Sequence, residues 1–263
     1  MLQVSVCSYS FHQMLKAGQM DIFQYIAWND KHGFSQLEPW MAHLEPGYAD
    51  DGFVQKVKDA ATACGLKFGC LAVDGVHIYE PDAAARAANR ERAKRWMDIA
   101  QMLGAQQVRI DAGGPEEPDA ATFDVIVEGY GDVLDYARRR GLEVLVENHW
   151  GPTIYAANVV KLLEAAPGLA LLLDSDNWAP GEAEIGARDC IRFARHTHIK
   201  RYLNQEQDTE AQRIGDLTLE ALWAAGYRGP WGIESIALPG EEEVAVLETL
   251  RYLQTKIGAL GTG

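Results

Sequence analysis

The chain has 263 residues, of which 48% are hydrophobic and 24% are charged, a balance typical of a soluble globular enzyme. No stretch approaches the roughly 18 uninterrupted apolar residues that a membrane span requires. The formal net charge of −14 repels phosphate backbones and anionic lipid surfaces, so we expect neither nucleic acid nor a membrane as a partner.

The N-terminal segment and the cysteines indicate the cellular compartment in which we expect the protein. The segment MLQVSVCSYSF lacks the basic region, apolar region and cleavage site of a signal peptide, so we expect a cytoplasmic protein. The four cysteines have no CxxC spacing, which favours reduced thiols over a disulfide framework or a zinc site. They are Cys7, Cys64, Cys70 and Cys190.

Short apolar runs alternate along the whole chain with longer stretches of helical periodicity, as in βα units arranged around a parallel sheet. In chain order, the predicted strands are residues 2–7, 35–38, 67–71, 107–111, 142–147, 169–174, 196–200 and 231–234. The clearest helical patterns cover residues 53–64, 83–103, 123–139 and 242–257. Glycines expected in the loops that return from helix to strand are Gly33, Gly65, Gly104, Gly141 and Gly226.

Eight such units predict a single (β/α)8 TIM barrel over residues 1–263, because barrels of this kind typically have roughly 250 residues. A doubly wound open sheet would show the same alternation. However, neither GxGxxG nor GxxxxGK[ST] follows the first strand, and the polar residues of interest gather at the ends of strands five to eight rather than at one switch point. The pattern therefore favours the barrel.

Four consecutive predicted strands end in a residue able to ligate a metal, within VLVEN, LLLDSDN, HTHIK and WGIES. Alternate residues of a barrel strand face the interior, and this parity points all four residues inward. They should converge on the C-terminal mouth, where barrel enzymes have their active sites. The predicted ligands are Glu147, Asp174, His198 and Glu234.

Three carboxylates around one imidazole form a hard, oxygen-rich set of ligands. Such a set suits Mn²⁺, Mg²⁺ or Co²⁺ best, with Zn²⁺ as a further candidate. A lone acidic residue after a strand is more often a helix cap or an ion-pair partner. Burying Glu147, Asp174 and Glu234 together is nevertheless costly unless a cation offsets their repulsion, so we predict one divalent metal ion.

The order of these fragments resembles the sugar isomerase/epimerase superfamily, the xylose isomerase-like TIM barrels that include ketose 3-epimerases, hydroxypyruvate isomerases and inosose dehydratases. The resemblance runs from SYSF through VENHWGPT, LDSDN, HTHIK and GIES. It implies that the same four residues bind the metal. The chain departs from the family's pattern at Asn177, where a histidine is common, at Arg201, where an aspartate is common, and over residues 148–153, where ketose 3-epimerases usually have a further glutamate.

The predicted metal would bind a substrate carbonyl and its neighbouring hydroxyl, acidify the C–H bond beside the carbonyl and stabilise the resulting enediolate. Glu147 and Glu234, on separate strands, are the predicted catalytic bases, and the resemblance implies that both are also ligands. One carboxylate on each face of the substrate would invert a carbon, whereas one shuttling a proton would move the carbonyl. We therefore predict a metal-dependent isomerase or epimerase of a ketose, sugar or related polyol.

Two polar residues beside the predicted ligands are candidates for contact with the substrate. His149 could bond a substrate hydroxyl or act as a general acid, with an ordinary surface histidine as the alternative. Lys200 has the inward parity of the ligands and could neutralise an oxyanion, or instead pair with Glu147 or Asp174.

Three residues at or beyond the ends of strands two to four, Glu38, His77 and Arg109, could bond the distant hydroxyls of a polyol. For Arg109, a structural ion pair with Asp111 is the favoured alternative. Tryptophans could cover the apolar face of a sugar from the mouth loops, or pack as ordinary core residues. They are Trp40, Trp150 and Trp178, and His196 is predicted to be a hydrogen-bonded core histidine.

Other functions compete with the isomerase. A lyase similar to inosose dehydratase would use the same proton abstraction and expel a hydroxyl with an acid such as His149. A non-catalytic sugar-binding subunit would keep the fold alone. A phosphodiesterase like endonuclease IV would need more histidine ligands and a basic groove, which the seven histidines and the acidic charge disfavour. We expect an unphosphorylated sugar or polyol as ligand, because no glycine-rich phosphate cradle is evident, and a homo-oligomer is an open alternative.

Overall fold

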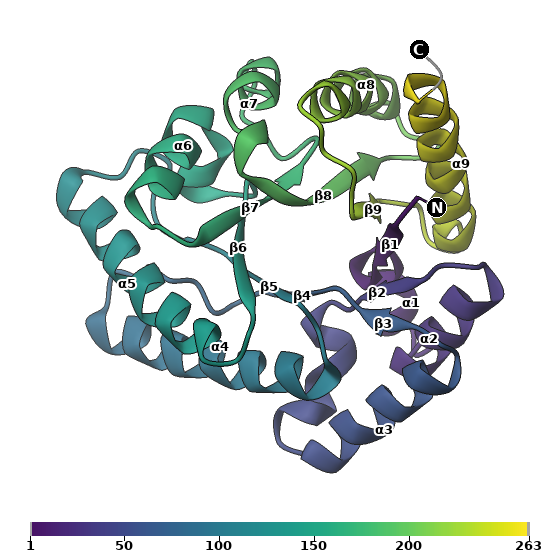
Figure 1. The fold of residues 1–263 in the computed structure, drawn as a ribbon, viewed down its shortest axis with the longest axis horizontal. Helices are drawn as coiled ribbons and strands as arrows, with labels where there is room; N and C mark the ends of the chain where they lie inside the picture. Colours follow the sequence, from purple (N-terminus) through teal and green to yellow (C-terminus); the bar gives the residue numbers. More distant parts are fainter. Residues whose placement is uncertain (1, 262–263) are drawn as a thin grey trace.

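The computed structural model describes residues 2–261, and its strands form one parallel sheet that curves into a barrel with the helices outside (Figure 1). Neighbouring strands follow the order β3-β2-β1-β9-β8-β7-β6-β5-β4, which confirms the predicted barrel. The strands are β1 (Val4–Cys7), β2 (Gln36–Glu38), β3 (Lys67–Phe68), β4 (Cys70–Val73), β5 (Gln107–Ile110), β6 (Glu143–Glu147), β7 (Leu169–Asp174), β8 (Ala194–Arg201) and β9 (Trp231–Ser235).

The third predicted strand is divided at Gly69 into β3 and β4, so eight predicted strands appear as nine. β3 pairs with β2, whereas β4 pairs with β5. The N–H of Gly69 donates to the carbonyl of Leu37 (2.9 Å), and its own carbonyl accepts from the N–H of Gln107 (3.0 Å). A Cβ at Gly69 would overlap the side chain of Gln36, so glycine suits the point where the barrel closes.

The helices surround the barrel, and several begin at an aspartate whose side chain caps the first turn. At the start of α4, for example, Asp82 accepts from the N–H of Ala85. The four predicted helical patterns correspond to α3, α4, α5 and α9 with ends shifted by up to three residues. The helices are α1 (His12–Lys16), α2 (Ile22–Lys31), α3 (Asp51–Ala63), α4 (Ala83–Leu103), α5 (Ala120–Arg138), α6 (Ala156–Ala165), α7 (Ala183–Asp189), α8 (Asp208–Ala224) and α9 (Glu242–Leu260).

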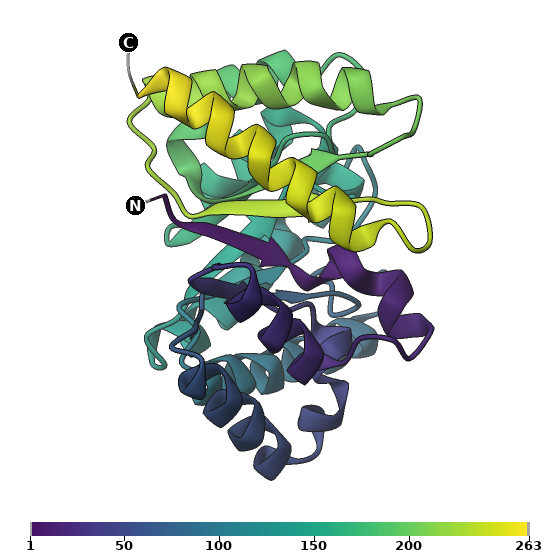
Figure 2. The same ribbon diagram turned by 90° about the vertical axis from the view of Figure 1, so that its right-hand side faces the viewer.

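Short 3-10 helices follow several strands, and the longest helices lie on the outside of the barrel. Figure 2 shows α9 running along the outside of the barrel, and this helix contacts β9 and α8. Among residues 2–261, no helix is long and apolar enough to cross a membrane. The 3-10 helices are η1 (Ser8–Phe11), η2 (Met41–Tyr48), η3 (Gly151–Ile154) and η4 (Ile191–Phe193).

The barrel wall separates two sets of buried side chains. Outward-facing residues such as Val144 and Val146 join the main hydrophobic core beneath the helices. The residues between them along the strands belong to a separate, smaller cluster, which comprises Cys70, Leu145, Ala170 and Leu172. This alternation confirms the inward parity predicted for β6 and β7, and it points Glu147 and Asp174, at the ends of the same strands, into the mouth.

Candidate metal centre and active site

The four predicted metal ligands lie together at the mouth, each on a different one of four adjacent strands. Glu147 ends β6, Asp174 ends β7, and His198 and Glu234 lie near the ends of β8 and β9. One ligand atom from each residue lies within 4.8 Å of the others, and all four residues are buried. Strand register produces this gathering, because Asp174 pairs with His198 across the two strands.

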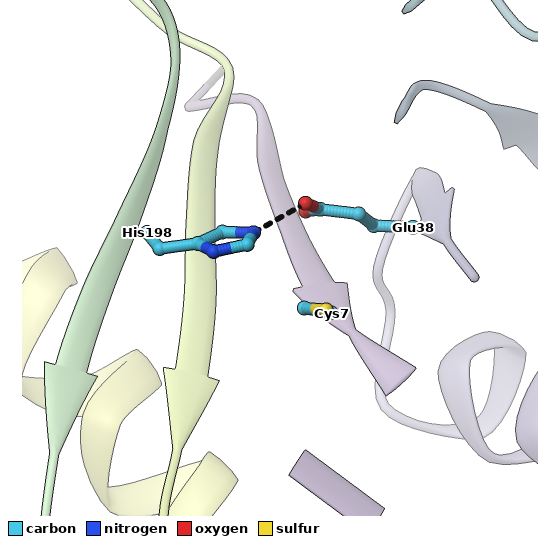
Figure 3. A group of neighbouring side chains, drawn as sticks. All are labelled: Cys7, Glu38 and His198. Atoms are coloured by element: carbon cyan, nitrogen blue, oxygen red, sulfur yellow. Dashed lines mark hydrogen bonds and ion pairs between the residues drawn. The ribbon is translucent and has the colours of Figure 1, made fainter. Parts of the chain in front are cut away.

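The imidazole of His198 faces the three carboxylates with one nitrogen only. Its Nδ1 lies 3.1 Å from Glu147 Oε1, 3.8 Å from Glu234 Oε2 and 3.9 Å from Asp174 Oδ2. Its Nε2 lies 2.6 Å from Glu38 Oε1, on the other side of the ring (Figure 3). A carboxylate behind a histidine fixes the ring's orientation and leaves the forward nitrogen for a metal.

Asp174 provides a test of whether these residues fit a cation. Burial, together with the negative charges of Glu234 and Glu147, raises the pKa of Asp174 to about 6, although Lys200 opposes the shift. Asp174 Oδ2 is buried and accepts no hydrogen bond of good geometry among the described residues, although the Lys200 ammonium lies 3.1 Å away. A buried carboxylate oxygen that faces a positive charge, beside two further carboxylates and an imidazole, fits a hard divalent cation.

Lys200 supplies a positive charge of its own to the same cluster. Its Nζ lies 2.8 Å from Glu234 Oε2 and 3.1 Å from Asp174 Oδ2, so the predicted pairing with Asp174 is present. The same Nζ donates to Asn177 Oδ1 (2.7 Å). The ammonium would therefore compete with a metal for two of the four predicted ligands.

Arg109 is buried and holds the outer oxygen of Glu147. Its Nε lies 3.1 Å from Glu147 Oε2, while its Nη1 donates to Asp111 Oδ2 (2.9 Å) and Asp74 Oδ1 (2.6 Å). The ion pair with Asp111, the alternative favoured for this residue, is thus present. Burial alone would raise the pKa of Glu147, but the charges of Arg109 and His198 lower it, which keeps this carboxylate ionised.

His149 stands at the entrance with its side chain 37% exposed. Its Nδ1 lies 3.2 Å from Asp111 Oδ2. Burial would lower the pKa of His149, but the charge of Glu147 and the hydrogen bond with Asp111 raise it to about 9. The residue is therefore a protonated imidazole at neutral pH, next to one of the predicted bases.

Glu38 is fully buried behind His198 instead of reaching the mouth. Its carboxylate accepts from Ser5 Oγ (2.9 Å) and lies 2.9 Å from His196 Nε2 in addition to its bond with His198. These contacts do not show the predicted bond to a polyol hydroxyl; instead, Glu38 holds the imidazole of His198, a predicted metal ligand. His196, which also bonds Gln107 (3.1 Å), is the buried, hydrogen-bonded histidine that its strand position predicts.

Comparison with known proteins identifies the family of this chain. A family model described as "xylose isomerase-like TIM barrel" matches residues 26–256. The chain belongs to this family. No curated protein shows a significant match to the sequence.

Solved structures share this xylose isomerase-like fold at low sequence identity. D-psicose 3-epimerase, crystallised in the presence of D-fructose, is 16% identical, with 98% of this chain and 100% of the other covered and a TM-score of 0.76. 3-Keto-D-glucoside 4-epimerase from E. coli is 15% identical, with 97% and 100% covered and a TM-score of 0.75. The probable 3-DHS dehydratase AsbF from Bacillus anthracis is 14% identical, with 96% and 99% covered and a TM-score of 0.75.

The remaining predicted residues lie around the rim of this xylose isomerase-like barrel. His77 is partly buried, with Nδ1 3.2 Å from Glu80 Oε1, and does not contact the four ligands. Trp150 donates to Asp111 (3.3 Å) and remains exposed, so it could contact a ligand. Trp178 packs instead against Gly186, where an added Cβ would overlap the indole.

Asn177 contacts two of the four predicted ligands, a role that its place in the sequence does not indicate. Asn177 donates to Glu147 Oε1 (3.3 Å), and its backbone N–H donates to Asp174 Oδ1 (3.0 Å). Tyr9 follows β1, and burial and then the charge of Glu234 raise its pKa.

Proposed function

We propose that this protein is a metal-dependent isomerase or epimerase of a ketose or a related polyol. The observation that carries the proposal is the presence of two buried glutamates, Glu147 and Glu234, on opposite sides of the set completed by Asp174 and His198. Structural neighbours that are named as epimerases of psicose and of a ketoglucoside support the same reaction class.

The four residues would hold one divalent ion, with Mn²⁺, Mg²⁺ and Co²⁺ favoured by the three carboxylates and Zn²⁺ as a further candidate. Once bound, such an ion polarises a substrate carbonyl and acidifies the adjacent C–H bond. Lys200 and Arg109 then keep the remaining carboxylate oxygens oriented, since each holds an oxygen of Glu234 or Glu147.

The two glutamates act as the bases that transfer the proton. Burial opposes ionisation of Glu234, but the charges of Lys200 and His198 lower its pKa to about 2, so both glutamates are bases at neutral pH. One glutamate removes the proton next to the carbonyl, and the other returns a proton to the opposite face, which inverts that carbon. If the first glutamate returns the proton to the neighbouring carbon, the carbonyl moves.

Elimination is the second candidate, and His149 is the observation that favours it. This protonated imidazole lies beside Glu147, so it could pass its proton to a departing hydroxyl, which leaves as water while Glu147 or Glu234 retains the abstracted proton. A dehydratase among the structural neighbours supports this alternative.

The test is solvent exchange. The protein is loaded with Mg²⁺ in D₂O, incubated with ketoses and with cyclic keto-polyols such as inososes, and the sugars are analysed by NMR and mass spectrometry. Deuterium at a carbon next to the carbonyl supports isomerisation or epimerisation, whereas loss of water identifies the dehydratase. Tight metal and sugar binding with neither deuterium uptake nor water loss would contradict catalysis and leave a sugar-binding subunit.

A further inference from the structure

A cavity of about 560 Å³, here called the rim cavity, opens beside the candidate active site. The loop after β4 contributes His77, Tyr79 and Glu80, the loop after β5 contributes Gly114, and the loop after β6 contributes Trp150. All three loops follow the C-terminal ends of strands, on the side of the barrel where the carboxylates lie. The volume lies within the roughly 300–1,000 Å³ range of small-molecule pockets.

The walls of the rim cavity are held in place. Trp150 Nε1 donates to Asp111 Oδ2 (3.3 Å), and the imidazole of His77 meets the indole edge to face at 4.4 Å between ring centroids. Trp150 nevertheless remains 36% exposed. Gly114 has φ of +97°, and a Cβ there would lie 3.3 Å from the ring of Tyr79, so the glycine allows the loop to approach this wall closely.

A continuous set of contacts links the rim cavity to the metal ligands. Asp111 Oδ2 accepts from Trp150, lies 3.2 Å from His149 Nδ1 and accepts from Arg109 (2.9 Å). Arg109 in turn lies 3.1 Å from Glu147. In this set of contacts Asp111 alone separates the indole from His149 and Arg109, so the rim cavity lies next to residues that contact Glu147.

The lining matches the two sides of a sugar ring. Trp150 and Tyr79 offer aromatic surface to a C–H face, while the partly exposed Glu80 carboxylate and His77 imidazole can bond hydroxyls at its edge. The carboxylate disfavours an anionic group such as phosphate. We propose that the rim cavity binds a second, uncharged sugar ring, so that the substrate is a glycoside or disaccharide whose other ring reacts at the carboxylates. This inference rests on the proposed function.

Binding of known sugars tests the rim cavity directly. Saturation-transfer NMR on the Mg²⁺-loaded protein would compare maltose, cellobiose and sucrose with glucose and fructose. We expect at least one disaccharide to receive saturation on both rings and to bind about tenfold more tightly than its components. Trp150→Ala should remove this advantage. Trp150→Phe, which keeps a ring but loses the bond to Asp111, should retain most of it.

Glu80→Gln provides a second variant that keeps the shape of the cavity, and it should weaken disaccharide binding by severalfold. Equal affinity for one-ring and two-ring sugars, or equal weakening of both by Trp150→Ala, would overturn the inference. Solvent exchange separates the two proposals. Deuterium uptake by monosaccharides without tighter binding of disaccharides would support the proposed function and contradict the second-ring site. Disaccharide binding that depends on Trp150, without deuterium exchange or loss of water, would support a second-ring site and contradict the proposed reaction.

Discussion

Replacing Glu38 by glutamine tests the proposed metal centre without changing any of the four predicted ligands. Glu38 is fully buried, and its Oε1 lies 2.6 Å from His198 Nε2. With a metal on Nδ1, Nε2 carries a proton and donates it to this carboxylate. Glutamine has nearly the same shape, and its two polar groups can still meet His196 and His198, because His196 can also bond Gln107 through its other nitrogen. The fold should survive.

The expected effect is a loss of roughly 10- to 100-fold in metal affinity, the usual range for removing the partner of a metal-binding histidine, or about 1.4 to 2.8 kcal/mol. Isothermal titration with Mn²⁺ in buffers of different ionisation enthalpy measures both affinity and proton release. Burial lowers the pKa of His198, but the charges of Glu38, Glu147 and Glu234 raise it well above its ordinary value. Metal binding to the wild type at pH 7 should therefore release about one proton from His198.

The Glu38→Gln variant should release fewer protons, because His198 loses one of the charges that raise its pKa. Glu164→Gln, which changes an exposed carboxylate paired with Arg192, serves as the matched control and should behave like the wild type. A Glu38→Gln protein that binds Mn²⁺ within about twofold of the wild type and releases as many protons would refute the positioning role of Glu38.

Three further predictions follow from the same cluster. The variants Glu147→Gln and Glu234→Gln, assayed at saturating metal, should each slow deuterium exchange by roughly 10²- to 10⁴-fold. Exchange at the wild-type rate in either variant would show that the replaced glutamate is not a catalytic base. The pKa of Asp174 without metal is raised to about 6, so protons compete with the metal for this carboxylate below that pH. Metal titrations from pH 7 to pH 5 should therefore show the metal affinity falling more steeply below about pH 6. An unchanged slope of affinity against pH would contradict the role of Asp174 as a ligand. The Lys200→Met variant should bind metal roughly tenfold more tightly yet exchange more slowly, because the ammonium no longer occupies Asp174 and Glu234. Weaker metal binding by this variant would contradict competition between the ammonium and the metal.

The barrel and the gathering of four residues were predictable because they depend on local periodicity and on a general property of parallel barrels. Alternation of apolar runs with helical patterns indicates βα units, and inward parity at the ends of adjacent strands brings Glu147 and Asp174 together. The break at Gly69 was not predictable, because it depends on backbone hydrogen bonds to both neighbouring strands, which local sequence does not encode.

Side-chain contacts between distant strands could not be predicted from the sequence pattern either. Glu38 ends a strand, as the ligands do, but its side chain reaches across the interior to His198, 160 residues away. Arg109 was correctly paired with Asp111, two residues later in the chain, whereas its contact with Glu147 joins two strands and appears only in the folded barrel. Side-chain length and rotamer decide such contacts, and residue spacing carries little information about either.

The most direct test of the account combines metal content with exchange in one protein sample. We predict about one Mn²⁺ per chain by elemental analysis after dialysis, with metal-dependent deuterium uptake into a ketose or keto-polyol that stops on chelation and returns when Mn²⁺ is restored. His198→Ala should lose both the bound metal and the exchange. Exchange that persists at full rate in the chelated protein or in His198→Ala would contradict the assignment of this cluster as the metal centre of the reaction.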